Sequence, residues 1–422
     1  MDAESEAGIE RTQAWRAEVS VRRYGTGNPE PGWASRPELL AYSDFMPGSP
    51  RHAYVHVPFC RHRCGYCDFT LVAGRDDLID RYFEAVAREL ERVRQPLETD
   101  TLYLGGGTPS HLGPDGLRRL FGLLSTKLGR AADAEVTVEA NPLDVTAEFV
   151  AAATECGVTR VSLGGQSLDA ATLRALDRDH VPAHVRAAVA RLLDAGLVVN
   201  LDLMTAAPGQ ALAAVEADLA AAVALGVQHV SVYCLTWEQG TAFETARRRG
   251  DLRPVDETLE GAMFELAIDR LEAAGYEHYE VSNFGRPGYR CRHNEAYWDC
   301  RPWEAFGPGA ARFDGRTRIT NHRSATTWIT KMLAGEDATG DIDEMTAEQA
   351  ARERLVVGLR RRAGIDRAVF LAASGYEFDQ LVGSTVAGWA AAGLATDDGV
   401  TVRLTRAGLL VSDSLWADVL TT

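Results

Sequence analysis

The feature that most limits how this chain can fold is a regular alternation of strand-like and helix-like stretches that begins at residue 52. Six short β-rich runs alternate with longer stretches in which apolar residues recur at spacings of three and four. Repeated strand–helix units favour a parallel sheet with right-handed crossovers and helices on its outer face. We therefore expect an α/β fold, a partial barrel of six units that is open wider than a closed eight-unit barrel. The expected strands are 52–57, 101–104, 135–139, 160–163, 198–204 and 229–235, and the expected helices are 78–93, 116–128, 147–156, 182–195, 211–225 and 256–274.

Glycines and polar residues gather where these expected strands end. The second strand runs into a glycine turn at 105–107, where missing side chains let the backbone approach a ligand closely. The third strand ends at Glu139, Gln166 follows the fourth, and the fifth contains Asp202 and Met204. A polar residue at one strand end can simply cap the next helix. Because ligands of parallel α/β folds collect at the carboxyl ends of the strands, we expect these residues to share one site.

Three cysteines, Cys60, Cys64 and Cys67, stand in a C-x-x-x-C-x-x-C frame just after the first expected strand. Thiolates are the usual ligands of iron–sulfur clusters, and a four-iron cluster normally takes four of them. With only three, the fourth iron would be open to a ligand that is not protein, and we expect the chemistry there. A zinc site with His56 or His62 as a further partner remains an alternative. A disulfide is a weaker one, since it would leave one cysteine unpaired.

Composition argues against several classes of protein. The net charge of −16 disfavours a general nucleic-acid binder, because such proteins carry a basic field. The longest Ala/Leu-rich stretch, 211–227, is interrupted by Glu216 and Asp218, so we expect no membrane span. The acidic start lacks the basic-then-apolar pattern of a signal peptide. The seven cysteines fit a reducing compartment, and we expect a cytoplasmic protein that binds neither nucleic acid nor membranes.

The chain divides into four expected segments. Residues 1–50 show little periodicity and are broken by prolines, which predicts an irregular leader. The barrel should occupy 51–285, and a connecting segment at 286–345 contains the run HNEAYW at 293–298. A separate small domain is expected at 346–422. Its expected helices are 347–362, 367–373, 377–391 and 406–420, and a hairpin at 394–404 gives a winged-helix-like unit.

Together these motifs resemble a known family. The cysteine frame, with Tyr66 and Asp68-Phe69 beside it, is similar to that of the radical S-adenosylmethionine (SAM) superfamily. Further motifs extend the likeness to the oxygen-independent coproporphyrinogen III oxidase-like group, over nearly the whole chain from residue 52. That group includes porphyrinogen oxidases, haem chaperones and class C radical methyltransferases. The matching motifs are GGGTPS at 105–110, EANP at 139–142, LGGQS at 163–167, LDL to PGQ at 201–210, YEVSNF at 279–284 and CRHNEAYW at 291–298.

The resemblance implies a (β/α)6 barrel, a helical C-terminal domain and a 4Fe–4S cluster held by Cys60, Cys64 and Cys67. It also implies SAM at the open iron and, in the oxidase and methyltransferase branches, a second SAM beside it. The positions matched to cofactor binding are Tyr54, Tyr66, Gly106, Gly107, Thr108, Glu139, Gln166, Arg178, Asp202 and Met204. Tyr54 and Arg178 are expected to position the pair of cofactors, and Tyr233, Cys234 and Tyr279 are candidates for returning a proton.

Individual residues bear on the choice among these branches. The oxidases have an extra cysteine two residues after the third, where this chain has Phe69. Haem chaperones share CDF, the HN-x-x-YW run and the C-terminal unit, but usually have Val at Gly165 and Tyr-Gly at Ala206-Ala207. The stretch CDFTLVAGRDD is more like the class C methyltransferases.

We therefore expect transfer of a methyl or methylene unit, including cyclopropanation, to an sp² carbon of a natural product. The substrate would be a small molecule or a peptide. A carrier such as flavodoxin or ferredoxin would be the electron donor. Haem handling as a chaperone, or a reaction like that of coproporphyrinogen oxidase, is the alternative.

Overall fold

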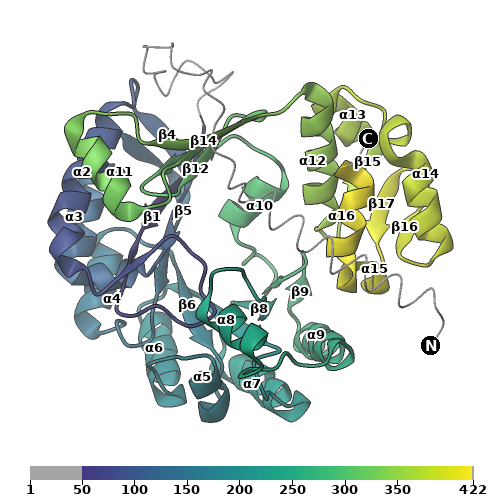
Figure 1. The fold of residues 1–422 in the computed structure, drawn as a ribbon, viewed down its shortest axis with the longest axis horizontal. Coiled ribbons are helices and arrows are strands. Elements are labelled where there is room, and N and C mark those ends of the chain that lie inside the picture. Colours follow the sequence, from purple (N-terminus) through teal and green to yellow (C-terminus); the bar gives the residue numbers. More distant parts are fainter. Residues whose placement is uncertain (1–49, 421–422) are drawn as a thin grey trace.

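The computed structural model describes residues 50–420, and its centre is a sheet of nine strands (Figure 1). The strand order is β11-β1-β4-β5-β6-β7-β8-β10-β9, and all neighbours from β11 to β8 are parallel. The bounds of the six strands that carry the repeating units are β1 His52–Val57, β4 Leu97–Gly106, β5 Leu128–Ala140, β6 Arg160–Gln166, β7 Val198–Thr205 and β8 His229–Cys234. This arrangement confirms the expected α/β fold.

Helices cover the outer face of the sheet (Figure 1). Each of the six expected helices is present, and several begin or end on recognisable signals. The Thr146 side chain accepts a hydrogen bond from Phe149 N at the start of α4, and Gly226, with φ 74°, ends α7. The bounds are α2 Ile79–Glu91, α3 Gly113–Leu124, α4 Ala147–Glu155, α6 Pro182–Asp194, α7 Leu212–Leu225 and α9 Glu257–Ala273.

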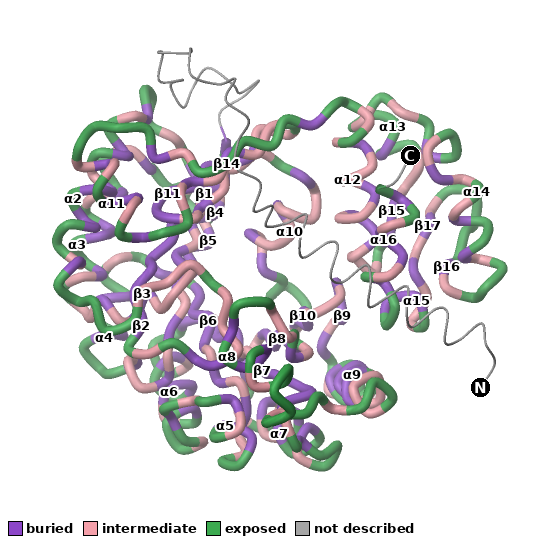
Figure 2. Tube along the Cα trace, in the orientation of Figure 1, coloured by how far each residue is buried: buried purple, intermediate pink, exposed green. Residues whose placement is uncertain are grey.

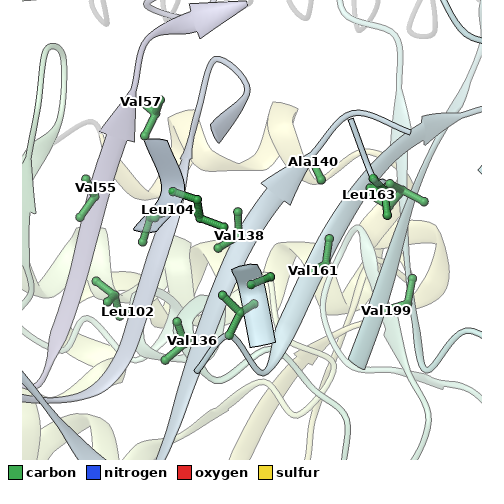
Figure 3. Close-up of a cluster of buried hydrophobic side chains, with 14 of the residues drawn as sticks. Val55, Val57, Leu102, Leu104, Val136, Val138, Ala140, Val161, Leu163 and Val199 are labelled. Carbon is green, nitrogen blue, oxygen red and sulfur yellow. The ribbon is translucent and has the colours of Figure 1, made fainter. Parts of the chain in front are cut away.

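The two faces of the parallel strands differ in chemistry. One row of outward-facing side chains crosses five strands in register and is fully buried under the helices (Figure 3): Val55, Leu104, Val138, Val161 and Val199. Burying each such side chain contributes about 1.5–3 kcal/mol. The neighbouring residues along each strand face the barrel interior and are largely polar, which leaves room for a polar site inside.

The segment that follows the barrel adds strands to both edges of its sheet. β9 (Glu277–His278) and β10 (Asn283–Gly285) extend one edge of the sheet, and β11 (Glu304–Phe306) pairs with β1 at the other. β11 is only three residues long and includes the buried Glu304, so no alternation marks it in the sequence. Also here are α10 (Arg292–Trp298), α11 (Ala325–Ala334) and an antiparallel sheet of β12 (Ala311–Phe313), β13 (Thr317–Asn321) and β14 (Thr339–Glu344).

A helical C-terminal domain with its own core lies beside the barrel (Figure 1). Its bounds are α12 Ala347–Leu359, β15 Ile365–Asp366, α13 Arg367–Ser374, α14 Phe378–Ala391, β16 Ala395–Asp397, β17 Thr401–Leu404, α15 Arg406–Leu410 and α16 Ser412–Leu420. The single last helix expected at 406–420 is therefore two helices. The expected leader lies outside the described residues, apart from residue 50, and the four-segment division stays a prediction. No helix between residues 50 and 420 is both long and apolar enough to cross a bilayer.

Candidate cofactor site

Cys60 ends β2 (Phe59–Cys60), which follows β1 directly, and Cys64 and Cys67 lie on the loop from β2 to β3 (Val72–Ala73). Cys60 and Cys64 are buried, whereas Cys67 is half-buried. Burial raises the pKa of the Cys60 thiol to about 12 and also raises the pKa of Cys67, because a buried thiolate is poorly solvated. Metal cations bound to the sulfur atoms would stabilise the thiolate forms. This donor set of three thiols on one loop therefore fits an iron–sulfur cluster.

The three cysteines do not form a site for a single metal ion. Among residues 50–420, no three His, Cys, Asp or Glu side chains converge on a point that would hold a single metal ion. A 4Fe–4S cluster needs no such point, because each cysteine binds a different iron atom.

The glycine turn after β4 is fastened to the cysteine loop by backbone hydrogen bonds. Gly107 N donates to Val57 O at 2.8 Å, and Thr108 N donates to Phe59 O at 2.8 Å. A Cβ at Gly107 would lie 2.8 Å from the backbone carbon of Pro58, so the close approach requires glycine. The Thr108 hydroxyl lies 3.2 Å from Cys60 Sγ. The turn and the cysteine loop thus form one unit.

Glu139 joins this unit to the barrel interior. Its carboxylate accepts hydrogen bonds from Gly106 N and from the Tyr103 hydroxyl, both at 2.9 Å. Gly106 has φ 111°, which glycine adopts readily, and a Cβ there would overlap the His56 ring. Tyr54 stacks on Tyr103, with ring centroids 6.1 Å apart. The predicted residues Tyr54, Gly106 and Glu139 are therefore neighbours.

Arg178 reaches the cysteine loop from the segment after α5 (Ala170–Ala175). One terminal nitrogen donates to Cys64 Sγ at 3.4 Å and the other to Gly164 O at 3.1 Å, while the buried Nε has no protein partner. Gln166 lies where the register of β6 slips, with φ 61°. The structure therefore places Arg178 against the cysteines and Gln166 at the adjoining strand end.

A cavity of about 60 Å³ lies in the barrel interior, and polar groups dominate its lining. Burial and the charge of Glu139 raise the pKa of Asp202 to about 7, although Ser162 and Asn200 donate hydrogen bonds to its carboxylate. Two buried polar atoms that no protein group satisfies, Arg160 Nη1 and Thr137 Oγ1, belong to lining residues. The lining residues are Tyr103, Thr137, Glu139, Arg160, Ser162, Asn200, Asp202, Tyr233, Cys291 and Asn294.

Two other predicted residues belong to a small apolar cluster and do not line this cavity. Met204 packs in a small cluster with Leu176, Leu235 and Phe243, and Tyr66 packs against the same cluster. We call this group the rim cluster.

Cys234 does not face the interior. It follows Tyr233 on β8, so its side chain points to the opposite face of the sheet, where its Sγ lies 3.2 Å from the Thr205 hydroxyl. It packs against the main core. The structure therefore places Cys234 away from the cavity, which Tyr233 does line, and the catalytic roles of both residues stay predictions.

Sequence reasoning missed α8 (Ala242–Arg249), which covers the cysteine loop. Phe243 N donates to Gly65 O at 2.9 Å, and the Phe243 ring lies where a side chain on Gly65 would be. Gly65, between Cys64 and Tyr66, is therefore required by the helix above it. The helix is short and its apolar residues show no extended helical periodicity, so no sequence pattern predicted the contact.

Substituting Gly65→Ala should disturb the cysteine loop, because the new methyl group overlaps the Phe243 ring. Overpacking of this kind costs about 1–3 kcal/mol. We expect a lower melting temperature and loss of iron and sulfide from anaerobically reconstituted protein. Gly122→Ala, on α3 with open space around it, is the matched control and should behave like the unchanged chain. The double variant Gly65→Ala/Phe243→Ala should recover iron. If Gly65→Ala kept the melting temperature and iron content of Gly122→Ala, the proposed contact would be contradicted.

Comparisons with known proteins agree with this geometry. Residues 54–222 match the family described as the radical SAM superfamily, and residues 345–411 match the HemN C-terminal domain. The chain is 38% identical over 379 residues to heme chaperone HemW of Mycobacterium tuberculosis (strain H37Rv), covering 88% of this chain and 95% of the relative. It is 32% identical to heme chaperone HemW of Bacillus subtilis, covering 87% and 98%.

Among solved structures, coproporphyrinogen III oxidase (HemN) from Escherichia coli superposes with a TM-score of 0.81, covering 96% of this chain and 98% of that one. The sequence identity is 20%, so this likeness shows the fold alone.

These relatives overturn the function expected from the sequence. The prediction of a class C radical methyltransferase or cyclopropanating enzyme acting on a natural product is wrong, because relatives matched over nearly their full length carry the name heme chaperone. One residue that stood against the haem chaperones is Gly165, where they usually have Val. A Cβ at Gly165 would lie 2.6 Å from Leu201 Cδ1, so the residue at this position concerns packing against the neighbouring strand. The chain belongs to the radical SAM superfamily, in the group of HemW- and HemN-like proteins.

Proposed function

We propose that this protein is a haem chaperone that carries a 4Fe–4S cluster and SAM. The observation that carries the proposal is the 38% identity to heme chaperone HemW of Mycobacterium tuberculosis across 95% of that relative. The radical SAM fold implies the cluster and SAM, whereas haem comes from the name of the relatives. We further propose that the protein acts in a reducing compartment such as the cytoplasm and is reduced by a carrier such as flavodoxin or ferredoxin.

The chain's own residues fit this pair of cofactors. Cys60, Cys64 and Cys67 would hold the cluster, which when reduced supplies one-electron chemistry to SAM. The glycine turn would receive the methionine part of SAM, and Glu139 would accept hydrogen bonds from the ribose hydroxyls. Arg178, with its donor to Cys64 Sγ, would stabilise the thiolate. The expected second SAM, at Gln166, Asp202 and Met204, rested on the oxidase and methyltransferase branches, and the proposed function does not need it.

Haem would bind outside the polar cavity in the barrel. Ligand sites that enclose a small molecule usually have volumes of about 300–1,000 Å³, and this cavity has about 60 Å³ and a polar lining. An apolar macrocycle is complemented better by apolar side chains. The core of the rim cluster is buried, and its partly exposed members, Tyr66, Trp237 and Leu252, are the apolar side chains available for such contacts. A site at the rim also suits a chaperone, because the bound haem can be handed to a partner.

His293 of the HN-x-x-YW run does not supply an iron ligand in this proposal. Its ring is buried and both nitrogens are engaged, with Nδ1 2.7 Å from the Thr101 hydroxyl and Nε2 2.9 Å from the Tyr297 hydroxyl. Burial lowers the pKa of His293 to about 3, so the ring is neutral at pH 7. It also stacks on Tyr103 at 5.1 Å. His293 therefore fixes α10 against the base of the barrel.

Oxidation of coproporphyrinogen III is the second candidate function, and the HemN-like fold favours considering it. Phe69 stands where the oxidases have their extra cysteine. We therefore expect no oxidation of coproporphyrinogen III by anaerobic, reconstituted protein supplied with SAM and dithionite. The measurement is separation of the porphyrins after the incubation. Accumulation of the decarboxylated product over several turnovers would replace the chaperone proposal with the oxidase.

For the cluster, we expect anaerobically reconstituted protein to contain four iron and four sulfide per chain, with absorbance near roughly 400 nm. Changing Cys60, Cys64 or Cys67 to Ala should abolish this absorbance, because each supplies one iron ligand. Cys300→Ala is the matched control, since Cys300 packs with Phe313 and Met345 away from the loop. Metal analysis checks the result, and zinc in place of iron would contradict the assignment.

For haem, titration of the reconstituted protein should give a saturable complex of one haem per chain, followed by the Soret absorbance. His293→Gln should keep that complex and its spectrum while lowering the melting temperature, because the ring contributes packing and two hydrogen bonds. Absence of saturable binding by the unchanged chain would refute the chaperone proposal. Loss of the iron-ligand signature in the variant alone would instead assign the ligand to His293.

A further inference from the structure

We propose that two arginines at the end of α8, Arg249 and Arg253, bind the propionate carboxylates of haem. We call these two residues the arginine pair. The proposal rests on the proposed function, because haem is the ligand, and it names the residues that recognise the charged edge of that ligand. The apolar macrocycle would lie against the partly exposed members of the rim cluster.

Helix α8 carries side chains of both kinds. Near its start is Phe243, whose ring centroid lies 6.0 Å from that of Tyr66 and 6.1 Å from that of Trp237. Tyr66 and Trp237 are both partly exposed. Arg249 ends the helix, about 9 Å further along its axis than Phe243. An extended arginine side chain adds to this reach, so its guanidinium can meet the edge of a flat ligand that lies on the two rings.

The loop after α8 returns to the rim cluster. Gly250, with φ 80°, ends the helix, and Asp251 N then donates to Ala246 O at 2.9 Å. This turn brings Leu252 back, so that it packs against the rim cluster. Arg253 follows Leu252 directly and is exposed. Both members of the arginine pair therefore lie on the short segment that holds Leu252 against the apolar side chains.

The arginine pair is available to bind an anion. Both residues are exposed, as is the whole stretch from 247 to 251 (Figure 2). Within residues 50–420, the guanidinium groups of Arg249 and Arg253 form no ion pair and no hydrogen bond with another residue. Their charge is therefore not neutralised by a neighbouring carboxylate.

The neighbouring charges leave this segment positive. The Nε atoms of Arg247 and Arg248 donate to the same carboxylate, that of Glu244, at 2.6 and 2.7 Å. Asp251 is the other acidic residue between 244 and 253, where the chain has four arginines. The next acidic residue, Asp256, caps the start of α9. In a chain with a net charge of −16, such a local excess of arginine attracts an anion that the rest of the surface repels.

Haem combines the two chemistries that this surface offers. Its macrocycle is flat and apolar, and its two propionates place negative charge at one edge. A guanidinium group binds a carboxylate through two parallel hydrogen bonds, which fixes the orientation of the ligand as well as adding affinity. The aromatic side chains would contact the ring, and the arginine pair would hold the charged edge.

The experiment compares haem with its dimethyl ester, which keeps the ring and the iron but has no free carboxylate. Each ligand is titrated into the reconstituted protein at low salt, and the Soret absorbance gives the dissociation constant. We expect the unchanged chain to bind haem about tenfold more tightly than the ester. The double variant Arg249→Gln/Arg253→Gln should bind haem about tenfold more weakly and the ester as before, because only the contacts with the carboxylates are lost.

The matched control removes the same charge elsewhere. Arg81 on α2 and Arg186 on α6 are also exposed and, within the described residues, also lack an ion pair. Arg81→Gln/Arg186→Gln should therefore leave both dissociation constants unchanged. For the unchanged chain, added salt should reduce the difference between haem and the ester, because exposed charges are screened.

Three results would overturn the role of the arginine pair. The first is unaltered haem affinity in Arg249→Gln/Arg253→Gln. The second is equal weakening of haem and the ester, since that would place the effect on the ring contacts or on the fold. The third is an equal loss in the control variant, since net charge alone would then explain it. Failure of the unchanged chain to bind either ligand would instead refute the chaperone proposal, and the inference with it.

Discussion

The backbone pairing between the ends of β1 and β4 is the contact on which the cofactor site depends. The two strands pair along their whole common length, and the hydrogen bonds from Gly107 to Val57 and from Thr108 to Phe59 continue this pairing into the two loops. The cysteine loop and the glycine turn therefore cannot move independently. A side chain at Gly107 would collide with the backbone of Pro58, so this pairing requires glycine at position 107. Through Gly106 the same unit orients Glu139.

The barrel interior sets a second condition, because buried polar groups that water cannot reach need hydrogen-bond partners within the protein. Asn200 bonds to Asp202, Ser162 and His229, and the other nitrogen of His229 lies 2.8 Å from the Tyr279 hydroxyl. Next to this network, the Glu135 carboxylate accepts hydrogen bonds from Arg160 Nε and from the backbone N–H of His293, at the start of α10. The HN-x-x-YW run thus closes the interior, and two of the buried groups left without a protein partner, Arg160 Nη1 and Thr137 Oγ1, belong to residues that line the cavity.

The sequence predicted the architecture because the strands that build it obey a simple rule. Apolar residues such as Val55 and Val138 alternate with interior polar ones, and the helices repeat at three and four. The rule fails for short elements: β11 has three buried residues, and α8 is placed by one contact between Phe243 and Gly65. For Cys234, an error of one position along the strand changes the face on which the side chain lies.

The branch of the family was harder to predict than the site, and the reason is physical. The residues proposed to hold the cluster and SAM are dictated by the cofactors, so proteins with different functions share them. Gly165, where the chaperones usually have Val, lies beside Leu201, so a difference at this position concerns packing within the fold and does not identify the ligand. What separates a chaperone from an enzyme that acts inside the barrel is the space and polarity left for the larger ligand. In the described part of the chain a polar cavity of about 60 Å³ lies in the barrel interior and the rim cluster lies apart from it, and the proposed haem site relies on this difference in polarity.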